Sequence, residues 1–203
     1  RLTNTYTGSA IQVQRADNVG GTHEIGFDSY GELDTAALTA AAQGNDMAVV
    51  TWYDQSGNGN DAEQTTSANR PKIYDGSTGY LGYLDLLDAS DSLTLNTTIT
   101  TGEFTIFSAL NPASNGMLVN NGGNNYLWYR DASSLGVRTS FGNYTFSATP
   151  AYGSLSLDVW NYSGSVVDVR QNATSIGSSA SITGNVTISK LGDRQPTENF
   201  LIN

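Results

Sequence analysis

The sequence predicts an all-β domain in which two antiparallel sheets pack as a sandwich, with one short surface helix. Short runs of β-forming residues recur along the chain, separated by glycine, asparagine, aspartate and serine, which is the strand-and-turn spacing of sandwiches. The 203 residues are 38% hydrophobic, which is enough to bury a substantial core in one domain. We expect a single domain over 1–203, excised from a longer chain because it opens abruptly at Arg1.

The strands are predicted from alternation and from apolar runs. In residues 10–14, Ile11 and Val13 alternate with polar residues and face one side of a sheet. Two continuous apolar runs, 47–53 and 104–110, suit strands that are buried on both faces. Further strands are expected at 126–130, 135–141, 155–160, 166–170 and 186–191.

The helix and the last strand complete the predicted fold. Residues 34–42 are rich in alanine, begin with Asp34 as an N-cap candidate and end before Gly44. The final apolar residues, 200–202, are predicted to form a closing strand.

Charge and composition exclude several classes of function. The chain has 19 acidic and 9 basic residues and a net charge of −10, so nucleic acid and anionic membranes meet a repulsive field. No apolar run is long enough for membrane insertion. Cysteine is absent, which excludes disulfides and thiolate chemistry. Few lysines with many Asn, Thr, Ser and Tyr are typical of exported adhesins and virion fibres, so we expect an extracellular or virion-surface location.

One ordered series of motifs resembles a known family. The most distinctive member is a buried strand that runs into a glycine-alternating polar loop, TWYDQSGNGND. The series resembles the N-terminal half of arabinofuranosidase-B-type catalytic domains. It resembles still more the versions of this domain that occur in bacterial and phage surface proteins. The second half looks like a laminin-G or concanavalin-A-like sandwich. The resemblance implies a concanavalin-A-like jelly roll that binds or hydrolyses glycans. It also implies that the closing strand pairs with the N-terminal strand near Ile11 and Val13. Its motifs lie at 8–15, 25–27, 31–38, 51–61 and 70–73.

The carboxylates that the resemblance implies are incomplete. A retaining glycosidase needs two carboxyl groups about 5–5.5 Å apart. The family's acid/base residue corresponds to Asp193, which also reads as an ordinary turn residue. The family's nucleophile corresponds to a position in the stretch 114–125, which contains no acid. Asp131 lies beyond the next strand, so we predict that the catalytic site is lost.

The loop after the second strand has two interpretations. Its oxygen-bearing residues alternate as in a calcium loop, with Gly59 at the sixth position, but Thr65 stands where such loops place a bidentate Glu. The other interpretation is a turn whose side chains bond its own backbone, with Asp54 at least half-buried. No other cofactor is expected. The calcium ligands would be Asp54, Ser56, Asn58 and Asn60.

Aromatic residues offer a glycan platform. The chain has 11 Tyr and 3 Trp, and exposed aromatic faces stack on sugar rings, although half of a strand's side chains point into the core. Trp52, Phe104 and Phe107 are expected in the core. A Ser-His-Asp triad would need the only histidine, His23, but the sequence has no Gly-x-Ser-x-Gly nucleophile elbow. We therefore interpret His23 as an exposed hairpin residue. The candidate carbohydrate-binding residues are Tyr126, Trp128, Tyr129, Tyr144, Asn124 and Asp193.

These features favour a non-catalytic adhesion or structural module that contacts polysaccharide. We expect it to belong to a larger homo-oligomeric assembly of a cell surface or virion fibre. One alternative is an active arabinofuranosidase-like hydrolase whose nucleophile lies elsewhere. The other is a purely architectural domain without a ligand.

Overall fold

A computed structural model of the chain describes residues 1–86, 90–110, 116–121, 126–131, 134–139, 142–147, 154–192 and 198–200. Over these residues the chain consists of strands and one α-helix, α1 (Thr35–Ala42), with a short 3-10 turn at Ser67–Asn69. The strands are β1 (Ile11–Arg15), β2 (Thr22–Ile25), β3 (Met47–Trp52), β4 (Ala62–Glu63), β5 (Lys72–Asp75), β6 (Gly79–Leu86), β7 (Ser92–Thr101), β8 (Phe104–Leu110), β9 (Gly116–Asn120), β10 (Tyr126–Asp131), β11 (Ser134–Arg138), β12 (Asn143–Ser147), β13 (Ser156–Tyr162), β14 (Val166–Gln171), β15 (Thr174–Ala180), β16 (Val186–Gly192) and β17 (Glu198–Phe200).

The strands form one hydrogen-bonded network that divides into two sheets at β3. The first half of β3 pairs with β5 through Met47 and Ala48, and its second half pairs with β4 through Thr51 and Trp52. One branch continues as β5-β6-β17-β8-β13-β14-β15. The other continues as β4-β7-β16-β9-β10-β11-β12. Every strand pairing described in these branches is antiparallel, so the predicted two-sheet antiparallel fold is confirmed.

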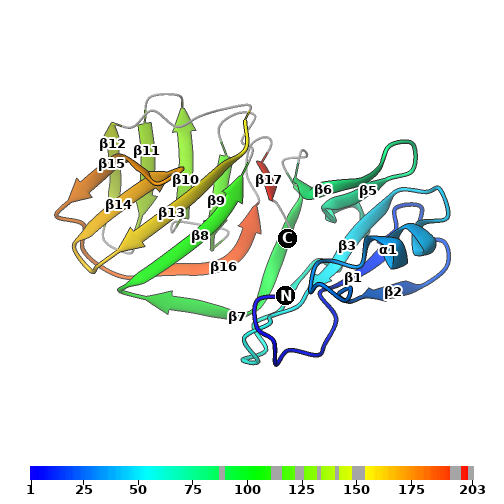
Figure 1. The fold of residues 1–203 in the computed structure, drawn as a ribbon. Helices are drawn as coiled ribbons and strands as arrows, with labels where there is room; N and C mark the ends of the chain where they lie inside the picture. Colours follow the sequence, from blue (N-terminus) through cyan, green and yellow to red (C-terminus); the bar gives the residue numbers. More distant parts are fainter. Residues whose placement is uncertain are drawn as a thin grey trace.

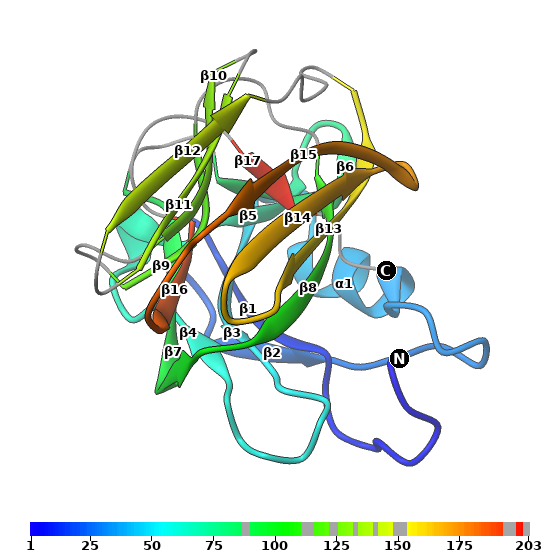
Figure 2. The same ribbon diagram turned by 90° about the vertical axis from the view of Figure 1, so that its left-hand side faces the viewer.

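The two branches face each other as a sandwich. Figure 1 shows the sandwich on the left, with β1, β2, β3 and α1 on the right. The quarter turn of Figure 2 shows β13, β14 and β15 in one layer and β10, β11 and β12 in the other. The outer strands of the two layers, β12 and β15, lie in contact, so this end of the sandwich is nearly closed.

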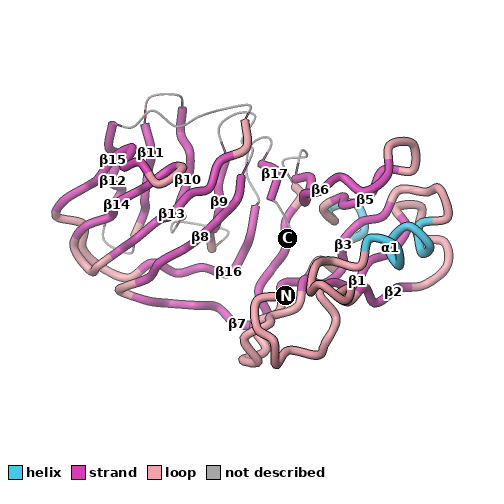
Figure 3. Tube along the Cα trace, in the orientation of Figure 1, coloured by secondary structure: helices cyan, strands magenta, loops and turns pink. Residues whose placement is uncertain are grey.

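Local sequence signals explain the single helix, which stands out by colour in Figure 3. The Asp34 side chain accepts a hydrogen bond from the backbone N–H of Ala37, 2.9 Å away, as an N-cap should. The helix ends at Gln43 in a left-handed conformation. Leu38 and Ala42 are buried, and the helix packs against β2, β5 and β6. The predicted short surface helix is confirmed.

The N-terminal strands follow the predicted pattern. Ile11 and Val13 are fully buried on one face of β1, and β3 contributes Met47 and Val49 to the same core. His23 lies in the β1–β2 hairpin opposite Val13 and is half-buried, where an exposed position was expected.

No helix among the described residues is long and apolar enough to cross a membrane.

Two predictions about the sandwich are wrong. Phe107 is 78% exposed, so β8 is not buried on both faces; Phe104 and Trp52 do pack against the core. The apolar run gave no sign of this, because its periodicity does not show which sheet covers each face. Phe200 does lie in a closing strand, β17, but it pairs with β6 and β8 and not with β1, since β2 and β3 already occupy both edges of β1. The rest of the predicted strand, residues 201–202, lies outside the described residues.

Candidate functional site

The end of β16 is where the resemblance places the acid/base residue, because Asp193 follows Gly192. Gly192 has a φ of +72°, and an added Cβ would lie 3.0 Å from the Asp91 carbonyl oxygen and 3.2 Å from the Leu86 side chain. Glycine is therefore required here both by conformation and by space. Asp193 itself lies outside the described residues.

Asn120 brings the middle of the chain to the end of β16. We call the region around Gly192, Asp91 and Asn120 the corner. Strand β9 pairs with β16 at Lys190 and Leu191, and the buried side-chain amide of Asn120 donates a hydrogen bond to the carbonyl oxygen of Gly192. Asn120 belongs to the stretch 114–125, where the resemblance expects a nucleophile. The described residue of this stretch that bonds to Gly192 therefore carries an amide and not a carboxyl group.

A carboxyl residue that the sequence analysis missed flanks the same corner. Asp91 directly precedes β7, and the neighbouring Ser92 pairs with Gly192 across β7 and β16. Asp91 is buried, and its backbone carbonyl closes the space beside Gly192. No motif marks Asp91 in the sequence, because only the long-range pairing of β7 with β16 places it here.

The predicted aromatic platform falls largely on strand β10. Tyr126, Trp128 and Tyr129 all lie in β10, between β9 and β11. Trp128 pairs with Gly136 and Tyr129 with the fully buried Leu135. Asn124, like Asp193, lies outside the described residues. The shared platform therefore stays a prediction.

Tyr144 of the predicted platform is tied into the structure by its hydroxyl group. The Tyr144 hydroxyl oxygen accepts a hydrogen bond from the backbone N–H of Thr183 and lies within 3.2 Å of the Thr183 hydroxyl. Its half-buried ring packs against the core. The bonds to Thr183 lower the pKa of Tyr144. Tyr144 thus links β12 to the turn before β16.

The Asp54 loop is bonded to itself, as one of the two interpretations predicts. Asp54 is half-buried. Its carboxylate accepts hydrogen bonds from the backbone N–H groups of Ser56 and Asn60, at 2.8 and 3.0 Å, and from the Ser56 hydroxyl at 2.8 Å. The Ser56 hydroxyl first, and then these N–H groups, lower the pKa of Asp54. The neighbouring Asp61 carboxylate accepts from the Asp54 N–H at 2.7 Å, which closes the loop.

The calcium interpretation of this loop stays a prediction. In the described parts of the chain, no three or more His, Asp or Glu side chains gather in an arrangement that would hold a metal ion. The predicted ligands Ser56 and Asn58 bond to each other, with the Asn58 amide donating to the Ser56 hydroxyl at 2.9 Å. Calcium would have to displace such bonds or share the same oxygens.

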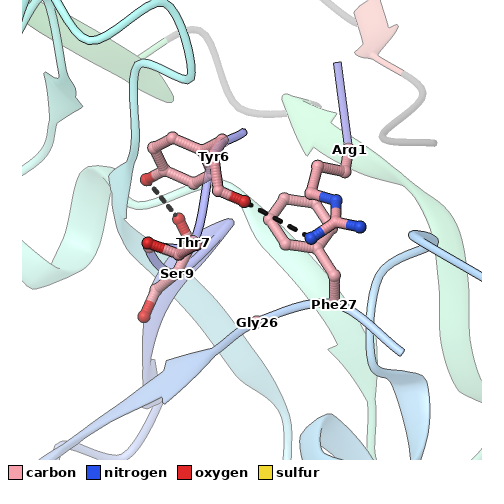
Figure 4. Close-up of a pocket in the computed structure, with 7 residues that line it drawn as sticks. Arg1, Tyr6, Thr7, Ser9, Gly26 and Phe27 are labelled. Atoms are coloured by element: carbon pink, nitrogen blue, oxygen red, sulfur yellow. Dashed lines mark hydrogen bonds between the residues drawn. The ribbon is translucent and has the colours of Figure 1, made fainter. Parts of the chain in front are cut away.

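An open cavity of about 290 Å³ lies beside the N-terminal segment. Figure 4 shows its two rings, Tyr6 and Phe27, with Arg1 alongside; the ring centroids are 6.2 Å apart and nearly perpendicular. The Tyr6 hydroxyl donates to the Ser9 carbonyl at 2.8 Å, which fixes that ring. The cavity is small and mixes aromatic, cationic and hydroxyl groups.

Two side chains donate hydrogen bonds to the carboxylate of Glu24 on β2. The Tyr53 hydroxyl donates to the Glu24 carboxylate at 3.0 Å, and the Gln12 amide donates to the same oxygen at 2.7 Å. Burial, followed by the bond to Glu24, raises the pKa of Tyr53 to about 12. Tyr53 therefore remains a hydrogen-bond donor at physiological pH.

Asp158 is an unexpected carboxyl group in the sandwich interior. It is 1% exposed, and its Oδ1 accepts a 3.1 Å hydrogen bond from the Gln171 amide, which also donates to Ser156. Its Oδ2 has no hydrogen-bond partner, and neither has the Ser108 hydroxyl directly opposite on β8. Burial raises the pKa of Asp158 to about 6, without a contribution from any described charged group.

Comparisons with known proteins reveal similarity only at the level of structure. No protein-family profile and no curated protein matches the sequence. A point mutant of a GH54 α-L-arabinofuranosidase soaked with 4-nitrophenyl α-L-arabinofuranoside superposes with a TM-score of 0.72 at 14% identity, covering 100% of this chain and 56% of that one. A GH54 α-L-arabinofuranosidase soaked with a cyclic sulfate inhibitor gives 0.71 at 15% identity, covering 99% and 56%.

A third solved structure extends the likeness to a sugar complex. An arabinofuranosidase complexed with arabinofuranosyl-alpha-1,2-xylobiose superposes with a TM-score of 0.58 at 13% identity, covering 100% of this chain and 57% of that one. The chain thus spans a little over half the length of each of these structures. Identities this low show the fold alone, so the chain has the β-sandwich fold of these arabinofuranosidases.

Proposed function

We propose that the chain is a non-catalytic glycan-binding module of a cell-surface protein or virion fibre. The observation that carries the proposal is the bond from Asn120 to Gly192. In support of this proposal, the side chain of that segment which contacts Gly192, the residue before Asp193, is the buried amide of Asn120. The fold of a sugar-cleaving enzyme would then be retained while the covalent step is lost.

The chemistry of the amide separates binding from turnover. Retaining hydrolysis passes through a glycosyl ester on a carboxylate, and an amide does not form that ester. Exposed polar side chains elsewhere on the fold can still donate and accept hydrogen bonds with sugar hydroxyls. The proposed ligands are polysaccharides with arabinofuranosyl groups, because such sugars are the ligands named for the structural neighbours.

The test uses the purified chain with 4-nitrophenyl α-L-arabinofuranoside and with arabinoxylan. We expect no release of nitrophenol or arabinose above the buffer control, and Asp193→Asn should not change that result. Affinity electrophoresis through arabinoxylan should show retardation of the same protein. Absence of retardation on every glycan of an array would favour the architectural domain instead.

A second candidate function, an active hydrolase, is favoured by the position of Asp91. Asp91 is buried beside Gly192, so a carboxyl residue does flank the corner from which Asp193 follows. If the chain releases arabinose, Asp91→Asn and Asp193→Asn should each abolish release, because two carboxyl groups are needed. Release that survives Asp91→Asn would exclude Asp91 as the second group.

A further inference from the structure

The first half of β13 presents its apolar side chains to solvent and its polar ones to the core, whereas Trp160 and Tyr162 in its second half are buried. Leu155, just before the strand, and Leu157 are 57% and 63% exposed, whereas Ser156 and Asp158 are each 1% exposed. The adjacent strand adds Phe107, which is 78% exposed. A sheet face in a water-soluble sandwich normally shows the reverse pattern, so this outer face needs an explanation.

The outward-facing residues, of which Val159 is half-buried, form rows across three strands. Val159 lies opposite Phe107 on β8 and opposite Arg170 on β14, which gives one row. The next row is polar. Asn161 lies opposite both Thr105 and Asp168. We call the face made by Thr105, Phe107, Leu157, Val159, Asn161 and Arg170 the outer platform.

The polar row is organised by hydrogen bonds. The Thr105 hydroxyl donates to the Asn161 side-chain carbonyl at 2.9 Å, a bond that uses the carbonyl oxygen of Asn161 and not its amide N–H groups. Arg170 and Asp168 form an ion pair at 3.2 Å, so the charges of these two side chains offset each other. An open cavity of about 320 Å³, lined in part by Glu103, Thr105 and Asn161, adjoins the row.

A neutral oligosaccharide fits these features better than other partners do. A sugar ring has an apolar C–H face that stacks on an aromatic ring, and hydroxyl groups at its edge that need donors and acceptors. Phe107 supplies the ring, and the row with Asn161 supplies the polar groups. A polyanion is disfavoured by the net charge of −10, and a purely apolar protein contact would leave the polar row without use.

We propose that the outer platform is the glycan-binding surface of the chain, with Phe107 as the stacking residue. This inference rests on the proposed function and names the place where it acts. It assigns binding to the outside of the β8–β13–β14 layer. The corner at Gly192 and strand β10 are then not the primary binding surface.

Phe107→Ala tests the assignment cleanly because the side chain is mostly exposed. We expect its dissociation constant for soluble arabinoxylan to rise at least tenfold, with an unchanged melting temperature. Asn161→Ala should weaken binding several-fold by removing an amide from the edge row. Tyr30→Ala is the matched control, since Tyr30 is an aromatic residue that is 89% exposed on another part of the chain, and its binding should equal that of the wild type.

The failures of the two proposals are distinguishable. Wild-type binding that Phe107→Ala leaves intact would overturn the outer platform while the glycan-binding function stands. A wild-type chain that binds no neutral glycan would overturn both. Sedimentation velocity adds a third outcome: a wild-type dimer that Phe107→Ala converts to monomer, without glycan binding, would make the face an interface between copies and overturn the assignment.

Discussion

The carboxyl group of Asp158 accepts a hydrogen bond from the Gln171 amide inside the sandwich, 3.1 Å away, while its second oxygen has no partner. A buried carboxyl group in neutral surroundings favours its protonated form. Its pKa of about 6 in the folded chain stands above the ordinary value of 3.8. This difference links the free energy of unfolding to pH.

Because the folded chain holds this proton more tightly, the contribution of Asp158 to stability is fully present below pH 3.8 and is lost as pH rises through about 6. Asp158→Asn should therefore raise the free energy of unfolding near neutral pH by about 3 kcal/mol, with a smaller gain towards acid. Urea titrations across this range measure it. Asp168→Asn, in the exposed ion pair with Arg170, is the control and should change stability by less than about 1 kcal/mol. A gain that is equal at all pH values would contradict the prediction.

Asp54→Ala should lower the free energy of unfolding by about 1–3 kcal/mol, because the N–H groups of Ser56 and Asn60 lose their acceptor. Chemical denaturation measures the change. Asn58→Ala, at an exposed position of the same loop, should have a smaller effect. The lowered pKa of Asp54 means that its contribution holds above pH 3.8 and is lost as pH falls through the folded value. A melting temperature that rises with calcium and falls with chelator would support the calcium interpretation instead.

Phe104 and Phe107 lie on one strand and should respond differently to truncation. Phe104 packs against Tyr162, with ring centroids 5.5 Å apart, so Phe104→Ala should destabilise the chain by about 2–4 kcal/mol. Phe107→Ala should change stability by no more than about 0.5 kcal/mol, since little of that side chain is buried. Thermal unfolding of both variants measures the difference, and equal losses would show that the outer face is covered.

Gly76→Ala should destabilise the turn between β5 and β6. An added Cβ would collide with the carbonyl oxygen of Gly44, and the Gly76 N–H also donates to Asp46 at 2.8 Å. We expect a loss of about 1–3 kcal/mol in chemical denaturation. Gly26→Ala is the matched control, because its Cβ would meet no atom within 4 Å. A neutral Gly76→Ala would mean that the two turns move apart freely.

The sequence was sufficient to predict those features that depend on interactions between residues close together in the chain. The cap of the helix by Asp34 and the closed loop around Asp54 depend on side chains bonding a backbone only a few residues away. Alternation placed Ile11 and Val13 on one buried face because the period of a strand is two. The two-sheet class followed from the spacing of strands and turns, and the motif series indicated the arabinofuranosidase-like sandwich.

Only the tertiary structure decided which face of each later strand is covered and which strands meet. The alternation of apolar and polar residues at the start of β13 fits either orientation of the strand, so the sequence alone left open whether Leu157 or Asp158 faces the core. The meeting of Asn120, Asp91 and Gly192 depends on pairings between strands far apart in the chain. Periodicity shows only which residues of a strand share a face, whereas burial depends on the sheet that packs against that face. The packing of the two sheets is decided by the division of the strand network at β3 and by the strand order in each branch.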